Sequence, residues 1–71
     1  MPATLVTVIV NGQSRELSAP VTVAELLRRL EIPSRGVAVE VNLAIVPRWR
    51  HAEHTLADGD QLEIVTLVPG G

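Results

Sequence analysis

The last two residues of the chain, Gly70 and Gly71, carry the clearest candidate for chemistry in the sequence. Glycine has no side chain, so a double glycine can enter a channel too narrow for any other residue. Gly71 ends in an α-carboxyl group, which is ionised at neutral pH and is a poor acyl electrophile until it is activated. A two-residue motif is a weak signal by itself, and an ordinary frayed terminus is the alternative.

Other residue types that can do chemistry are few. His51 and His54 lie three apart, as metal ligands on a helix sometimes do, but no third ligand accompanies them. We therefore expect solvated loop histidines and no metal site. Asp58-Gly59-Asp60 lacks the rest of a calcium-binding loop and is typical of a turn. Trp49, the lone aromatic, either caps the core or serves as a contact anchor on the surface.

Composition excludes several classes of protein. The chain has 71 residues, enough for one small domain, and it has no cysteine, so neither a disulfide nor a thiolate metal site can form. The net charge of −2 argues against a nucleic-acid partner, and no apolar stretch is long enough for a membrane partner. Residues 1–4 do not start a signal peptide. We expect a cytoplasmic protein.

Hydrophobic periodicity predicts five strands and one helix. Asn11-Gly12 is a strong hairpin signal, because a type I′ turn needs positive φ at both positions. Thr22 and Glu25 have the spacing of a capping box, and the apolar stripe that follows is typical of a helix that Pro33 stops. The segment 48–56 is either a helical turn or an irregular loop. The predicted strands cover residues 5–10, 13–17, 37–41, 44–46 and 62–68.

This order of elements predicts an α+β fold. One helix cannot cover both faces of a sheet in so short a chain, so the economical packing is a mixed five-stranded sheet with the helix across one face. The first and last strands are the most apolar and should lie side by side in the middle, which is the β-grasp arrangement. We expect residues 1–67 to form the domain and residues 68–71 to form a flexible tail.

Several segments together resemble the ThiS-type sulfur carrier proteins, the ubiquitin-like carriers of thiamin thiazole biosynthesis. The resemblance covers nearly the whole chain and is densest from Val37 onward. The 49–51 segment, Trp-Arg-His, has no counterpart in it. The matching segments are Val-Ala-Val-Glu-Val-Asn at 37–42, Ile-Val-Pro-Arg at 45–48, the stretch 56–65 around Asp-Gly-Asp, and the final Gly-Gly.

The resemblance implies a carrier that acts as a co-substrate and is not an enzyme. A ThiF-type activating enzyme, using ATP and Mg, would adenylate Gly71. A cysteine desulfurase persulfide would supply sulfur to give a thiocarboxylate, and a ThiG-type thiazole synthase would accept it. Gly70 would allow the tail to thread into these partners, and the chain itself would bind no cofactor. A carrier for molybdopterin or cysteine synthesis, a protein modifier and an interaction module with an idle tail are the alternatives.

Strand alternation predicts where partners dock. If Val6, Val8 and Val10 face the core, then Ile9 points to the other side of the sheet. Val65 and Leu67 have the same phase in the last strand, so these three residues are expected to form an exposed apolar patch beside the tail. The alternative is a sheet buried on both faces, or a register that differs by one residue.

Overall fold

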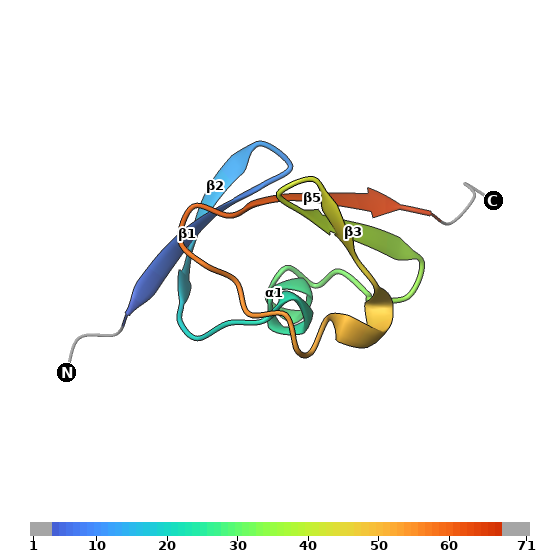
Figure 1. Cartoon of the computed structure of the whole chain (residues 1–71), viewed down its shortest axis with the longest axis horizontal. Coiled ribbons are helices and arrows are strands. Elements are labelled where there is room, and N and C mark those ends of the chain that lie inside the picture. Colours follow the sequence, from blue (N-terminus) through green and yellow to red (C-terminus); the bar gives the residue numbers. More distant parts are fainter. Residues whose placement is uncertain (1–3, 68–71) are drawn as a thin grey trace.

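The computed structural model describes residues 4–67 and shows a mixed five-stranded sheet with one α-helix on one of its faces (Figure 1). The strand order is β2-β1-β5-β3-β4, with β1 and β5 parallel and the other neighbours antiparallel. The predicted fold is therefore confirmed. The elements are β1 (Leu5–Val10), β2 (Gln13–Ser18), α1 (Val23–Arg29), β3 (Val37–Val41), β4 (Ala44–Val46), the 3-10 helix η1 (Arg48–Arg50) and β5 (Gln61–Thr66).

The predicted tail, residues 68–71, lies outside the described residues, and with it Gly70 and Gly71. Within residues 4–67, no helix has both the length and the apolar character that a bilayer crossing needs.

Both hairpins turn through two residues with left-handed backbone conformations. Asn11 and Gly12 have φ values of 49° and 83°, and Asn42 and Leu43 have φ values of 51° and 72°. Positive φ at both central positions is the requirement of a type I′ turn, whose twist matches that of the flanking strands. The turn predicted at Asn11-Gly12 is therefore confirmed, whereas the second turn places Leu43 in a conformation that leucine rarely takes.

Helix α1 begins at a complete capping box, as predicted. The Thr22 hydroxyl accepts a hydrogen bond from the Glu25 amide at 3.2 Å, and the Glu25 carboxylate accepts one from the Thr22 amide at 3.0 Å. The hydrogen bond from the Thr22 amide is the largest cause that lowers the pKa of Glu25, and desolvation opposes it. The bond from the Thr22 hydroxyl and the charges of Arg29 and Arg28 lower the pKa further.

The C-terminal end of the helix differs from the prediction that Pro33 stops it. The helix ends at Arg29, because Glu31 adopts a φ of 58° and the backbone closes a Schellman motif. In this motif the Ile32 amide donates to the Leu27 carbonyl at 2.8 Å and the Glu31 amide donates to the Arg28 carbonyl at 3.1 Å. A glycine at position 31 would have indicated this helix end in the sequence, but the position is occupied by glutamate, which is uncommon in the left-handed conformation.

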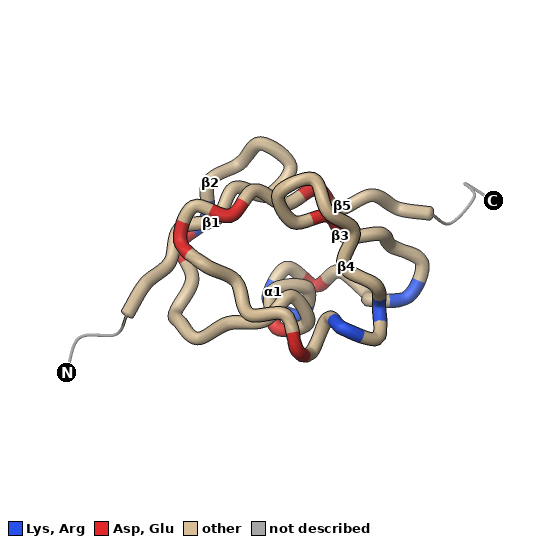
Figure 2. The backbone as a smooth tube through the Cα atoms, in the orientation of Figure 1, with Lys and Arg blue, Asp and Glu red and all other residues tan. Residues whose placement is uncertain are grey.

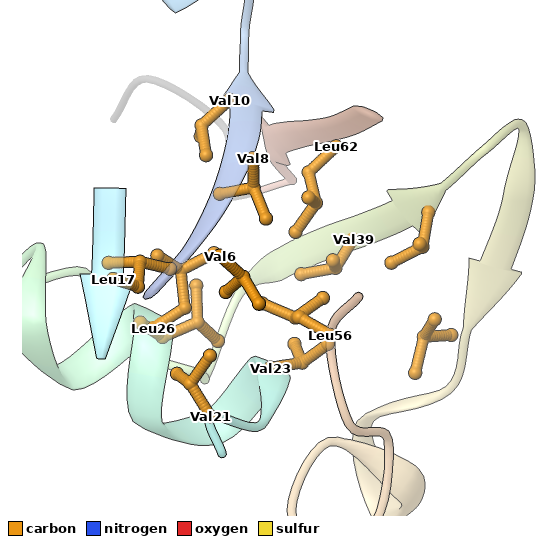
Figure 3. Packing of buried hydrophobic residues seen from close by; sticks show 13 residues of the cluster. Val6, Val8, Val10, Leu17, Val21, Val23, Leu26, Val39, Leu56 and Leu62 are labelled. Atoms are coloured by element: carbon orange, nitrogen blue, oxygen red, sulfur yellow. The ribbon is translucent and has the colours of Figure 1, made fainter. Parts of the chain in front are cut away.

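The hydrophobic core lies between the sheet and the helix (Figure 3). Val8, Val39 and Leu62 from the three central strands are almost completely buried, and Leu26 and Leu27 of α1 pack in the same cluster. The predicted apolar stripe of the helix thus faces the sheet. Because the core consists of valine, leucine and isoleucine side chains, the central strands are rich in β-branched residues that suit a pleated surface.

The segment after η1 docks against the first turn of the helix. The Ala24 amide donates to the His51 carbonyl at 2.9 Å, and the Val23 amide donates to the His54 carbonyl at 3.0 Å. The first N–H groups of a helix have no partner within the helix, so these two carbonyls satisfy them. The segment 48–56, for which a helical turn and an irregular loop were both open, therefore begins with a 3-10 turn and contributes to the cap of the helix.

Because this segment packs against the helix, His51 is buried, and the prediction that it is a solvated loop histidine is wrong. The side chain is only 3% exposed, and its Nε2 lies 3.0 Å from the Val46 carbonyl oxygen. His54 is partly buried. The segment has no periodicity that would indicate which of its residues face inward. In residues 4–67, no three histidine, cysteine or acidic side chains gather where they could hold a metal ion.

The Asn11 side chain extends the contact between β1 and β5. Its Nδ2 donates to the Ile64 carbonyl at 3.2 Å, and its Oδ1 accepts from the Ile64 amide at 2.8 Å. The backbone pairing of β1 with β5 covers only Ile9–Gln61 and Val10–Leu62. The side-chain amide therefore takes the place of a further strand residue and holds the second half of β5.

We expect Asn11→Gly to lower the free energy of unfolding by about 1–2 kcal/mol, because it removes two hydrogen bonds and glycine accepts the positive φ. Urea unfolding measures the loss, and hydrogen exchange should show a less protected Ile64 amide. Leu43→Gly is the matched control, since Leu43 has the same backbone conformation and a side chain that is 91% exposed. Equal effects of the two substitutions would contradict the role of the Asn11 amide.

Candidate functional site

Strand β5 is the element that leads to the predicted tail. It runs antiparallel to β3, from the pair Leu62–Val41 to the pair Thr66–Val37. One residue further on, the Leu67 amide donates to the Gly36 carbonyl at 2.7 Å, so the strand stays attached to the sheet up to the last described residue. The chain therefore leaves the sheet at the end where β3 begins (Figure 1).

The three residues of the predicted patch all have side chains that are at least partly exposed. Val65 is 53% and Leu67 is 63% exposed, and Ile9 is partly exposed, whereas Leu62 in the opposite phase of β5 is 1% exposed. The sheet is thus open on the face away from the helix. The alternation that predicted this face holds for both central strands.

The register separates these residues more than the prediction supposed. Ile9 pairs with Gln61, four positions before Val65, so the two apolar side chains lie about 13 Å apart along the sheet. They nevertheless line one shallow groove on the open face, between the two hairpin turns. Leu67 lies beyond this groove, toward the tail. The docking role of Ile9, Val65 and Leu67 stays a prediction.

The groove also contains two carboxylates whose pairing was not predicted from the sequence. Glu40 of β3 and Glu63 of β5 are direct cross-strand partners, and both line the groove. Like charges directly opposite each other are unfavourable, so a cation from a partner would relieve their repulsion. The alternation of residues 37–41 indicates which face of the sheet Glu40 lies on. That Glu40 lies directly opposite Glu63 is known only from the register of β3 and β5.

The rim of the groove adds exposed apolar surface from the second hairpin. Ile45 is 69% exposed and pairs with Glu40, and Leu43 in the turn is 91% exposed. Together with Val65 they surround the acidic pair with apolar side chains. This arrangement has no catalytic geometry among the described residues, and it suits binding to a surface that is apolar with a basic group at its centre.

The sheet order, the crossing helix and the open face define a ubiquitin-like β-grasp protein. The chain belongs to the ThiS family of sulfur carriers, whose family model matches residues 8–71. The resemblance seen in the sequence is therefore confirmed. The matched range includes the open-face strands and the final Gly-Gly.

Individual relatives agree with this family. The chain is 38% identical over 64 residues to the sulfur carrier protein ThiS of Escherichia coli strain K12, which covers 90% of this chain and 97% of the relative. A crystal structure of the thiamine biosynthesis protein ThiS from Geobacter metallireducens superimposes with a TM-score of 0.77 and 29% identity, covering 92% of this chain and 99% of the other.

Two further relatives are much longer. The chain is 49% identical over 63 residues to a thiazole synthase of Paramagnetospirillum magneticum, and 36% identical over 61 residues to a thiazole synthase of Magnetococcus marinus. These matches cover 89% and 86% of this chain. The chain spans only 19% of the length of either synthase.

We expect Val65→Asp to leave the fold intact, with a loss of about 1 kcal/mol, because the side chain already faces solvent. Val39→Asp is the matched substitution on the neighbouring strand. It places a carboxylate at a position that is 0% exposed and should cost more than about 4 kcal/mol. Thermal unfolding followed by circular dichroism compares the two. Collapse of the Val65→Asp protein would show that this face is core.

Proposed function

We propose that this chain carries sulfur as a thiocarboxylate on Gly71 and donates it for the thiazole moiety of thiamin. The observation that supports this most strongly is the family match, which runs through the domain and includes Gly70 and Gly71. The Escherichia coli relative is named a sulfur carrier protein and the Geobacter metallireducens relative a thiamine biosynthesis protein, and both names support this proposal.

The chemistry requires activation, since a carboxylate does not accept a sulfur nucleophile directly. A carboxylate oxygen of Gly71 attacks the α-phosphate of ATP bound with Mg in a ThiF-type partner, and pyrophosphate leaves. The persulfide of a cysteine desulfurase attacks the acyl carbon of this adenylate, and AMP leaves. A thiol then reduces the resulting acyl disulfide, which releases the thiocarboxylate. This chain supplies the acyl group and no catalytic side chain.

The acceptor of the sulfur would be a ThiG-type thiazole synthase. The two relatives named thiazole synthase support this partner, because a segment similar to this chain is part of the synthase polypeptide in each. All these steps would take place in the cytoplasm. The organism that encodes this chain is expected to encode the activating enzyme and the synthase as well.

The domain would serve as the part that partners recognise. The open face with Ile9, Val65 and Leu67 would hold a partner while residues 68–71 reach its active site. Four extended residues span at most about 14 Å, enough to cross the wall of an active site while the domain stays outside. A double glycine at the end of this reach passes where side chains would collide.

The proposal predicts a mass change on Gly71. Incubation with ATP, Mg, the ThiF-type enzyme, a cysteine desulfurase and cysteine should raise the intact mass by the difference between sulfur and oxygen. Omission of ATP is the control. Conjugates of high mass would indicate a protein modifier instead, and an unchanged mass with the organism's own enzymes would contradict the proposal.

Gly70→Ala should reduce adenylation by at least about tenfold, because a methyl group next to Gly71 blocks entry into a channel that fits glycine. Exchange of labelled pyrophosphate into ATP measures this step. The unfolding midpoint should match that of the unaltered chain, which separates the block from a loss of stability. Full exchange activity of the substituted protein would refute the steric role of Gly70.

A further inference from the structure

A short turn with exposed aromatic and basic side chains follows β4, and it lies outside the groove on the open face of the sheet. Its residues are Arg48, Trp49 and Arg50 of η1, which we call the basic knob. Trp49 is 74% exposed, and the Arg50 guanidinium carbon lies 5.9 Å from the centroid of the indole ring. This cation–π contact occupies one face of the ring and leaves the rest of the indole accessible. Trp49 therefore lies on the surface and does not cap the core.

The knob is firmly attached to the domain. The Arg50 amide donates to the Pro47 carbonyl at 2.8 Å, and the Arg50 carbonyl accepts from the amides of Glu53 and His54 at 2.9 Å. Directly after the knob, His51 is buried, and its carbonyl caps the helix. A turn fixed at both ends presents its side chains with little further loss of conformational entropy on binding.

The position of the knob links it to the tail. Val46, two residues before Arg48, pairs with Val39, so the chain leaves β4 toward the end of the sheet where β3 begins. Leu67, the residue after β5, donates its amide to the Gly36 carbonyl at this same end. Arg35 precedes that glycine and is exposed. Figure 2 shows the basic segments gathered at this end of the sheet, near the point where β5 stops.

Charge is therefore separated within the molecule. Half of the six basic residues, Arg35, Arg48 and Arg50, lie at this end of a chain whose net charge is −2. Among the hydrogen bonds of residues 4–67, no carboxylate accepts from these three guanidinium groups. The open face instead carries Glu40 and Glu63. A surface that complements the knob must be acidic and must have an apolar pocket for Trp49.

We propose that the basic knob, together with Arg35, docks on an acidic rim of the activating adenylyltransferase, beside the channel that takes the tail. The identity of the partner rests on the proposed function. Trp49 favours a protein surface over a free phosphate ligand, because an indole gains most from a desolvated pocket. A contact at the end of the sheet where β5 stops would fix the direction in which the carboxylate enters the active site, which is what adenylation requires.

The test measures binding of the ThiF-type adenylyltransferase to the full chain by calorimetry at low and high salt. We expect Trp49→Ala to weaken binding by about tenfold or more at both salt concentrations, as for a buried aromatic anchor. Arg48→Gln with Arg50→Gln should weaken binding several-fold at low salt and reduce its salt dependence. Arg28→Gln with Arg29→Gln, which removes two exposed arginines from the helix, is the matched control and should bind as the unaltered chain does.

The outcomes separate the two proposals. If the unaltered chain gains sulfur and the knob variants bind as tightly as the helix control, the knob proposal is wrong and the carrier function stands. If the variants lose binding only to the thiazole synthase, the assignment to the activating enzyme is overturned. If the unaltered chain neither binds the adenylyltransferase nor gains sulfur, both proposals fall. Unfolding midpoints of all variants exclude a loss of fold as the cause.

Discussion

One α-helix of seven residues, with buried loop residues such as Val21 and Leu56 beside it, covers a single face of the five-stranded sheet in the described part of the chain. Within these residues, the other face has no covering layer. The buried side chains gather on the helix side, where Val8, Val39 and Leu62 are fully enclosed. The opposite face keeps exposed apolar residues that a larger protein would cover with a second layer. A partner protein can supply that layer. The small size of the fold and the exposed face that is available for binding therefore have the same cause.

Strand β5 changes character along its length. It starts in the middle of the sheet, between β1 and β3, where Leu62 is 1% exposed. By Val65 the side chain is 53% exposed, and the backbone pairs only with β3 while Asn11 supports the other side. The strand thus joins the buried centre of the sheet to the end that precedes residues 68–71. The side chain of a turn residue makes this transition possible without a longer β1.

The parts of the fold that local rules determine were predictable from the sequence. The type I′ turn at Asn11-Gly12, the capping box and the strand phases follow from residue type and spacing, and they indicate the sheet and its open face. Features that depend on distant contacts were not predictable. His51 is buried because its segment caps a helix about 27 residues earlier in the chain, and Glu31 ends that helix without the expected glycine. Glu40 and Glu63 meet only through the register of β3 and β5.

The parallel pair of β1 and β5 joins residues that are far apart in the sequence, such as Ile9 and Gln61. The turn before β5 contacts β1 as well, because the Thr7 amide donates to the carboxylate of Asp58, 51 positions away, at 2.7 Å. Contacts of such long range form late, because a large loop must close before they contribute. A nascent chain that has left the ribosome only as far as its second hairpin therefore lacks the strand that organises the sheet. The open face of the sheet is complete only when β5 has left the ribosome and has inserted between β1 and β3.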